Sequence, residues 1–414
     1  MNDNLLESDN ELSETILHSI EAYLETNTHI YIYPNFIDRI LDNVADLMII
    51  TLASTPGFNE TLIISLVSEN IQYYFSTIGI PRSYESSIIL RPVDEDSITQ
   101  QLDKLRNVEQ PAQKSTEWYT RRHTMLTASS IWQALATQSA QNRLIYKKCA
   151  PLNMSKCFQV NTSSPMHWGQ KYEPISQRFY EHMYSTTLEE FGCIPHSTHL
   201  FLGASPDGIN NKKDNERYGR LVEIKNIVNR EITGIPKKEY WVQMQLQMEV
   251  TDLDECDFLE TRFKEYESEE EFMKDGGFDK CEKIKGVIIQ FSARGGPVYK
   301  YCPFLADKDA VEDWINKSLD ENESMTWIKN IYWSLEEYSC VLVTRNRKWF
   351  EVALPQFENI WKTILYERIN GYDHRKAKKR GKAPKTENII LKIRTESFDH
   401  ADLHSSGGLP AIET

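Results

Sequence analysis

The front of the chain alternates between apolar and polar positions with the period of an α-helix. Between residues 36 and 48, apolar side chains stand at positions 36, 37, 40, 41, 44, 47 and 48, which is the spacing of one helix face. Asn35 can cap this helix, and a second helix is predicted from about residue 59 to 75. Residues 13–105 are therefore expected to form a small helical appendage that serves as a scaffold or docking surface.

The middle of the chain changes to the two-residue period of β-strands. We expect strands at 199–202, 221–225 and 256–262, and a charged hairpin at 210–219. In the second strand, Leu221, Glu223 and Lys225 share one face. If that face is buried, the acid and the lysine both need a partner.

A helix is predicted within residues 164–184. Its apolar stripe consists of Tyr172, Ile175, Phe179 and Met183. Pro174 fits only near a helix start, so the helix is expected to begin near Gly169 or to be kinked at the proline. Glu173 lies beside the stripe, where it can point into a cleft or be an acid favoured by the helix N-terminus.

The last third of the chain is predicted to hold a hairpin, two helices and one more strand. The hairpin is expected at 285–304, the helices at 311–327 and 355–369, and the strand at 339–344. Residues 374–385 contain seven basic residues in twelve, which suits an inert tail, a phosphate contact or a nuclear signal. The expected organisation is an acidic helical region at 1–106, a main domain at 107–370 and a basic tail at 371–414.

Composition narrows the class of protein. The chain is 40% hydrophobic and 26% charged, lacks an apolar run of membrane-spanning length and has no basic signal-peptide start, so we expect an intracellular protein without a membrane partner. Seven cysteines without a CxxC pair argue against a zinc ribbon or iron–sulfur cluster and favour a reducing compartment.

The net charge of −14 comes from the front of the chain. Residues 1–110 hold 18 acids and 5 bases, whereas the other 304 residues hold 43 acids and 42 bases. Because the local field matters more than the total charge, the nearly neutral remainder can still form a basic channel.

A turn precedes the strand with the acid and the lysine. Residues 203–209 read Gly-Ala-Ser-Pro-Asp-Gly-Ile, in which Pro206 fixes one dihedral and Gly208 tolerates a positive φ. Asp207 on this turn and Glu223 on the strand can share a divalent cation, with Lys225 beside it.

A second candidate site lies at a predicted helix start near Thr127 and Ser129. Free backbone N–H groups and hydroxyls make such a place receptive to a phosphate. Arg121 and Arg122 can add a guanidinium fork. The alternative is an ordinary helix cap with two solvated arginines.

Glutamines interrupt the apolar run of the predicted helix at 240–250. Gln243 and Gln247 are four residues apart and share a face, while Gln245 points elsewhere. Because apolar side chains surround them, at least one glutamine is expected to line a site.

Five motifs follow one another along the chain. They are Arg122-x6-Ser129, Glu173, Ser-Pro-Asp-Gly at 205–208, Glu-Ile-Lys at 223–225 and Tyr240-x2-Gln243-x-Gln245. In this order, over about residues 115–262, the chain resembles the phage lambda exonuclease and YqaJ-type viral recombinase nucleases, a branch of the PD-(D/E)xK superfamily. The helices and acids at the front also resemble the longer alkaline exonucleases of large DNA viruses.

The resemblance implies an α/β (α+β), restriction-endonuclease-like core with a mixed sheet flanked by helices. Asp207, Glu223 and the backbone carbonyl of Ile224 would bind Mg²⁺ or Mn²⁺, and Glu173 would help to hold a second ion. Lys225 would position and activate the attacking water.

The resemblance extends to groups that would contact DNA. Arg122 and Ser129 would hold the 5′-terminal phosphate, and Ser205 would support the scissile phosphate or the metal. Gln243 would steady Lys225 or the water. Tyr240 and Gln245 complete the expected DNA-binding set.

The implied function is a metal-dependent 5′→3′ exonuclease that acts on the ends of linear duplex DNA in viral replication or recombination. A single-strand annealing protein and further copies of the chain are the implied partners, in the host cytoplasm, at a viral replication site, in the nucleus or in the virion. Two alternatives stay open: a structure-specific endonuclease or RNase on the same fold, and a non-catalytic module that binds DNA ends.

Overall fold

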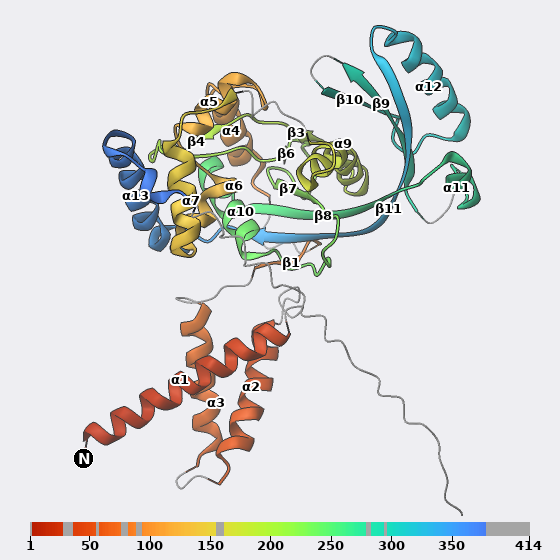
Figure 1. Ribbon diagram of the computed structural model, residues 1–414. Coiled ribbons are helices and arrows are strands. Elements are labelled where there is room, and N and C mark those ends of the chain that lie inside the picture. Colours follow the sequence, from red (N-terminus) through yellow and green to blue (C-terminus); the bar gives the residue numbers. More distant parts are fainter. Residues whose placement is uncertain are drawn as a thin grey trace, which may run out of the picture. The chain divides into compact units, whose positions relative to one another are not determined.

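The computed structural model describes residues 2–27, 36–54, 58–75, 82–87, 93–154, 161–278, 283–293 and 296–377 (Figure 1). The chain up to Arg375 forms one compact unit. The expected cap Asn35 and the basic stretch from residue 378 onward lie outside the described residues. None of the helices in the described ranges combines the length and the apolarity that a membrane crossing requires.

Three helices at the front of the chain bury apolar side chains against one another. They are α1 (Asn2–Thr26), α2 (Phe36–Leu52) and α3 (Glu60–Tyr73). Ile20, Ile40 and Val67, one from each helix, lie in the same buried cluster. The side chain of Asn59 caps α3 by accepting a hydrogen bond from the Leu62 N–H at 3.2 Å. The bounds of α2 and α3 confirm both helices expected in this region.

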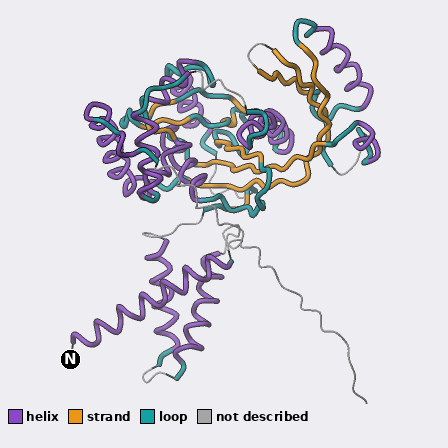
Figure 2. Tube along the Cα trace, in the orientation of Figure 1, coloured by secondary structure: helices purple, strands orange, loops and turns teal. Residues whose placement is uncertain are grey.

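The centre of the fold is an eight-stranded sheet among the described residues. Its order is β10-β9-β11-β8-β7-β6-β3, with β1 pairing to β11 beside this path. The strands are β1 (Tyr84–Glu85), β3 (Leu188–Glu189), β6 (Gly208–Asn210), β7 (Leu221–Asn226), β8 (Glu255–Glu265), β9 (Lys285–Ala293), β10 (Gly296–Tyr301) and β11 (Thr326–Thr344). β7 and β8 run parallel, whereas the other pairs are antiparallel. The expected mixed sheet flanked by helices is therefore confirmed (Figure 2).

A smaller three-stranded sheet leads into this one. It consists of β2 (Leu126–Thr127), β5 (Leu202–Ala204) and β4 (Ile194–Pro195), in the order β2-β5-β4. β5 ends just before the turn that carries Asp207, and β6 begins just after it. This turn thus connects the two sheets.

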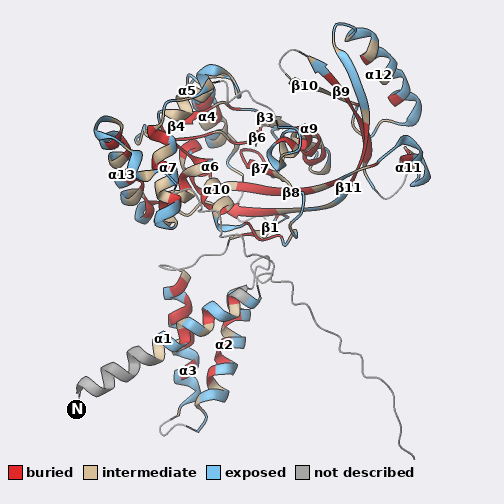
Figure 3. Cartoon of the chain, in the orientation of Figure 1, coloured by how far each residue is buried: buried red, intermediate tan, exposed pale blue. Residues whose placement is uncertain are grey.

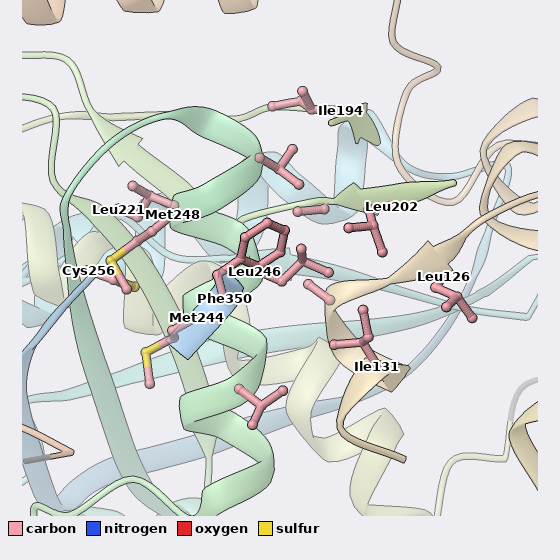
Figure 4. Packing of buried hydrophobic residues seen from close by; sticks show 14 of the residues in the cluster. Leu126, Ile131, Ile194, Leu202, Leu221, Met244, Leu246, Met248, Cys256 and Phe350 are labelled. Atoms are coloured by element: carbon pink, nitrogen blue, oxygen red, sulfur yellow. The ribbon is translucent and has the colours of Figure 1, made fainter. Parts of the chain in front are cut away.

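Helices complete the layers on both sides of the sheet. They are α4 (Glu95–Arg106), α5 (Thr116–His123), α6 (Ala128–Ile131), α7 (Gln138–Cys149), α9 (Pro165–Met183), α10 (Lys238–Thr251), α11 (Glu269–Lys274), α12 (Lys308–Glu321) and α13 (Arg347–Asn370). The alternation along β7 explains the two layers, because Val222 and Ile224 pack with α9 and Leu221 packs with α10. Figure 4 shows Met244, Leu246 and Met248 of α10 in the latter cluster, and Figure 3 shows how fully α10 and β8 are buried.

Several element boundaries differ from those that the sequence predicts. α9 begins at Pro165 rather than near Gly169, because Ser164 caps it and Pro165 suits the first helical position. The helix includes Pro174 well inside. β5 starts at Leu202, since the preceding residues form a turn.

The largest differences lie around β11. Pairing with both β8 and β9 extends this strand over 19 residues, where 339–344 alone were expected. Its first part contains Trp327, which was expected to end the helix that instead stops at Glu321. α13 starts at Arg347 rather than at Pro355, because the Asn346 side chain caps it.

The segment before residue 106 takes part in the packing of the sheet. β1 pairs with β11, and Leu102 and Leu105 of α4 belong to the same buried cluster as α10. The expected domain boundary at 106 therefore falls inside this packed region, whereas the expected boundary at 371 lies close to the division after Arg375.

Candidate active site

Glu223 is the centre of a polar cluster in an otherwise apolar layer. Its side chain has no exposed surface, and it forms an ion pair with the Lys225 ammonium on the same face of β7. Gln243 of α10 donates a 2.7 Å hydrogen bond to Glu223 Oε1, and Gln247 donates a 2.6 Å bond to Oε2. Both carboxylate oxygens therefore have partners, as a buried charge requires.

Asp207 is held beside this cluster by the backbone. Its Oδ2 accepts a 2.8 Å hydrogen bond from the Ile224 N–H, between Glu223 and Lys225. From α9, Gln177 donates a 3.1 Å bond to the Asp207 carbonyl. The turn is thereby fixed against β7.

Gly208 serves a different purpose from the one its sequence context suggests. It lies in β6 and is not among the described glycines with a positive φ. A Cβ at this position would stand 3.2 Å from Leu188 Cβ on the neighbouring strand β3. The glycine therefore provides room for close strand packing rather than an unusual backbone angle.

Three carboxylates influence one another at this place. Burial, followed by the charge of Glu223, raises the pKa of Asp207 well above its usual range. Burial also raises the pKa of Glu173 on α9, against the charge of Lys114, and Glu223 contributes in the same direction as burial. The pKa of Lys225 is also raised, but for another reason: burial lowers it, and the charges of Glu223 and Asp207 outweigh burial.

The side chains of the acidic cluster are of the type that binds hard metal ions. Within the ranges that the structure describes, no three carboxylate, imidazole or thiol groups stand close enough together to hold a metal. The chemistry of Glu173, Asp207 and Glu223 fits a hard divalent cation, since such cations prefer carboxylate oxygens. Burial and then the charge of Glu223 raise the Asp207 pKa, and a bound cation would favour the charged form of the carboxylate.

A second group of polar side chains gathers around Arg122. Its guanidinium donates to Ser129 Oγ at 2.9 Å and to Ser205 Oγ at 3.4 Å, and it lies 4.2 Å from the centre of the Trp118 ring. Arg121 turns away and donates to the Glu109 carbonyl at 2.6 Å. Of the two arginines, Arg122 is therefore the one that joins Ser129 and Ser205.

Tyr240 lies against the lysine of the acidic cluster. Its ring centre is 5.2 Å from Lys225 Nζ and 5.4 Å from the Arg230 guanidinium. Arg230 forms an ion pair with Glu260, which is the register partner of Lys225 on β8. Neither Arg230 nor Glu260 was anticipated, because register between distant strands cannot be read from sequence spacing.

Gln245 does not belong to either group. It is 2% exposed, donates to the Thr344 carbonyl at 2.8 Å and accepts from the Asn346 N–H at 2.7 Å. Its expected contact with DNA is therefore not supported by its position, which joins α10 to the start of α13. Gln247 was not among the expected site residues, although its spacing of four from Gln243 signalled a shared face.

Part of the chain is similar to known proteins. Residues 117–254 match the model of the family described as YqaJ-like viral recombinase domain. An uncharacterized protein of Acanthamoeba polyphaga mimivirus is 32% identical over 307 residues, which is 64% of this chain and 55% of that relative. The match thus spans little more than half of the relative's length.

Two crystal structures are also similar. An alkaline exonuclease from Laribacter hongkongensis matches with a TM-score of 0.36 and 19% identity, over 63% of this chain and 95% of the other. The same enzyme in complex with dAMP matches with a TM-score of 0.35 and 18% identity over the same shares. The family match covers the Arg122 group, the Asp207 turn, β7 and α10. Over residues 117–254, the chain is therefore similar to the family of YqaJ-like viral recombinase domains.

Proposed function

We propose that this chain is a metal-dependent 5′→3′ exonuclease that hydrolyses phosphodiester bonds at the ends of linear duplex DNA. The supporting observation is the link between the two polar groups. Gln247 Nε2 lies 2.6 Å from Glu223 Oε2 and 3.4 Å from the Ser205 carbonyl, while Ser205 Oγ accepts from Arg122. A guanidinium, which suits an anion, is thus linked to the acidic cluster through Ser205 and Gln247.

Glu173, Asp207, Glu223 and the Ile224 carbonyl are the proposed ligands of two Mg²⁺ or Mn²⁺ ions. When bound, such ions lower the pKa of a water and neutralise charge on the leaving oxygen. The protein's own part begins with orientation: Gln243 and Gln247 fix the Glu223 carboxylate, and the Ile224 N–H fixes that of Asp207. Carboxylates held in this way need little reorganisation when the substrate arrives.

Lys225 is the proposed group that orients the attacking water. Its raised pKa keeps the ammonium protonated near neutral pH, so it donates hydrogen bonds and stabilises negative charge. Tyr240 packs beside its Nζ and limits where the lysine can move. The lysine therefore acts on a water or phosphate oxygen close to Glu223.

Arg122 and Ser129 are the proposed contacts to the 5′-terminal phosphate. The terminal phosphate carries about −1.5 to −2 charges near pH 7, more than an internal phosphodiester. A guanidinium and a hydroxyl suit its oxygens. Binding of the 5′-terminal phosphate beside the site of phosphodiester cleavage would explain why the protein acts as an exonuclease rather than an endonuclease.

The biological setting is part of the same proposal. We place the activity in viral DNA replication or recombination, in an intracellular and reducing environment, with duplex DNA ends as substrate. A single-strand annealing protein and other copies of this chain are the proposed partners.

The test is a cleavage assay with three DNA substrates and purified full chain. Linear duplex with a 5′ phosphate, the same duplex with a 5′ hydroxyl, and closed circular DNA are each incubated with Mg²⁺. Selective loss of the phosphorylated linear duplex from its 5′ ends is expected. Nicking of the circle identifies an endonuclease, and binding without any cleavage in Mg²⁺ or Mn²⁺ identifies a non-catalytic end-binding module.

A further inference from the structure

Two cationic side chains, Lys148 of α7 and Arg368 of α13, converge behind the Arg122 group. Lys148 of α7 donates a 2.5 Å hydrogen bond to the backbone carbonyl of Arg122. Arg368 of α13 donates to the His123 carbonyl at 3.0 Å and to the Lys148 carbonyl at 2.9 and 3.1 Å. These bonds satisfy carbonyls at the C-terminal ends of α5 and α7, where a helix favours positive charge.

The charges of this group are not balanced by acids. In the described part of the chain, the contacts of Arg122, Lys148 and Arg368 go to hydroxyls, backbone carbonyls and aromatic rings, without a carboxylate partner. Lys148 is nevertheless only 7% exposed. Because a buried lysine without a counter-charge is costly, the arrangement is best suited to a state in which an anion is bound nearby.

We propose that Lys148 is a positioning residue that determines the preference of the Arg122 group for a terminal, doubly charged phosphate. It anchors the Arg122 backbone, so that the guanidinium faces Ser129 and Ser205, and it adds a positive charge behind that guanidinium. This inference rests on the proposed function, in which Arg122 and Ser129 bind the 5′ phosphate. Arg368 takes part by fixing the carbonyl of Lys148 itself.

The charges around Lys148 support a pH dependence of the preference for a 5′-phosphorylated end. Burial, followed by the charges of Arg122, Lys147 and Arg368, lowers the Lys148 pKa to about 7, against an opposite effect of Cys193. Burial also lowers the pKa of Arg122 and of His123, the latter with contributions from Arg368 and Lys148. These groups come from α5, α7, α13 and the residue before β4.

The sign of the pH effect follows from linkage. A bound phosphate dianion raises the Lys148 pKa, so binding takes up a proton when the pH is above about 7. The terminal phosphate itself is dianionic above a pKa of about 6. The preference for a phosphorylated end should therefore be strongest near pH 7 and fall as the pH rises towards 8.5.

The experiment compares Lys148→Met and Lys148→Arg with a matched control, Lys147→Met, which removes an exposed charge from the same helix. For each full-length protein, kcat and KM are measured with Mg²⁺ on duplexes that differ only in a 5′ phosphate or 5′ hydroxyl. Binding of both duplexes is followed by fluorescence anisotropy in EDTA. All measurements are made at pH 7.0 and 8.5.

We expect Lys148→Met to reduce the phosphate preference about tenfold, the size of one charge-assisted hydrogen bond, mainly through KM. Lys147→Met should keep the wild-type preference. Lys148→Arg, which stays charged at both pH values, should keep the preference and lose its decline between pH 7.0 and 8.5.

The outcomes separate the two proposals. If the wild-type protein neither cleaves the duplexes nor distinguishes the 5′-phosphate end from the 5′-hydroxyl end, the proposed function is wrong. A wild-type protein that prefers phosphorylated ends, with Lys148→Met equal to Lys147→Met, overturns the role of Lys148 alone. If Lys148→Met does not fold, Lys148→Arg decides: a pH profile like that of the wild type overturns the inference, and a flat profile supports it.

Discussion

Gln247 donates a 2.6 Å hydrogen bond to a carboxylate oxygen of Glu223, and both side chains are completely buried. The bond joins α10 to β7 at the acidic cluster. Because both groups lack water, each depends on the other for its hydrogen bonding. This relationship connects the stability of the fold directly to the geometry of the candidate active site.

Replacing Gln247 with leucine should destabilise the protein. The change removes the donor to Glu223 Oε2 and leaves a buried charged oxygen without its partner, which costs about 1–3 kcal/mol. The free energy of unfolding, from urea titration at pH 7, measures the effect. The half-buried Gln243 offers a comparison, since Gln243→Leu lets water replace the lost donor and should cost less. Equal stability of Gln247→Leu and wild type contradicts the argument.

Lys225→Met should abolish most cleavage. Replacing Lys213, an exposed lysine of the adjacent hairpin, should leave cleavage unchanged. Loss of a positioned proton donor in a reaction of this kind lowers the rate about 10²- to 10⁴-fold. Steady-state cleavage of linear duplex DNA with Mg²⁺ is the measurement. Lys213→Met is the matched control because Lys213 is exposed. A thermal unfolding curve for each variant separates lost chemistry from lost folding, and normal cleavage by a folded Lys225→Met refutes the assignment.

Arg122 and Arg121 should differ sharply when each is replaced by alanine. The Arg122 guanidinium contacts Ser129 and Ser205, whereas the described hydrogen bond of the Arg121 guanidinium goes to the Glu109 carbonyl. Arg122→Ala should lose the preference for 5′-phosphorylated duplex by about tenfold or more, and Arg121→Ala should keep it. Competition between phosphorylated and hydroxyl-ended duplexes in one reaction tests this. The same loss in both variants argues against a specific phosphate contact by Arg122.

Mg²⁺ should stabilise the protein through Asp207. A ligand at about a hundred times its dissociation constant adds about 2.7 kcal/mol to the free energy of unfolding. We expect a rise in melting temperature on adding Mg²⁺, its loss in Asp207→Asn, and no cleavage in EDTA. Asp214→Asn is the matched control, since Asp214 is exposed and its φ of 57° suits asparagine. A melting temperature of Asp207→Asn that still responds fully to Mg²⁺ contradicts the proposed ligand.

Glu249 should contribute to stability at neutral pH and not in strong acid. Burial acts to raise its pKa, but His196 and Arg345 outweigh burial and lower it to about 2, with Arg345 Nε 2.7 Å from Glu249 Oε2. A lowered pKa stabilises the folded protein above the unfolded value of about 4.3, and this stability is lost as pH falls towards 2.

Glu249→Gln should therefore lower the free energy of unfolding by about 1–2 kcal/mol at pH 6, less than the full pKa difference because water screens part of the pair. The deficit should shrink between pH 4 and pH 2. Urea titrations at pH 2.5, 4 and 6 measure it, with the exposed Glu323→Gln as control. A deficit that stays constant with pH excludes the charge as its origin.

Local periodicity was sufficient for part of the site. Alternation along a strand was enough to predict that Glu223 and Lys225 share a face, and the spacing of four on a helix placed Gln243 with Gln247. The structure confirms both relationships, in the Glu223–Lys225 ion pair and in the two amide bonds to Glu223. Glu223 and Lys225 are close in sequence on one strand, and Gln243 and Gln247 share a face because they are one helical turn apart.

Tertiary packing decided the rest. Only the folded chain distinguishes Arg122 from Arg121, directs Gln245 to the Thr344 carbonyl rather than to the site, and extends β11 between two partner strands. The sequence by itself determined the residue types, their local faces and the family resemblance. The neighbours across strands and helices, such as Lys148 and Arg368 behind Arg122, were decided by the tertiary structure, because burial and the meeting of distant segments depend on the whole core.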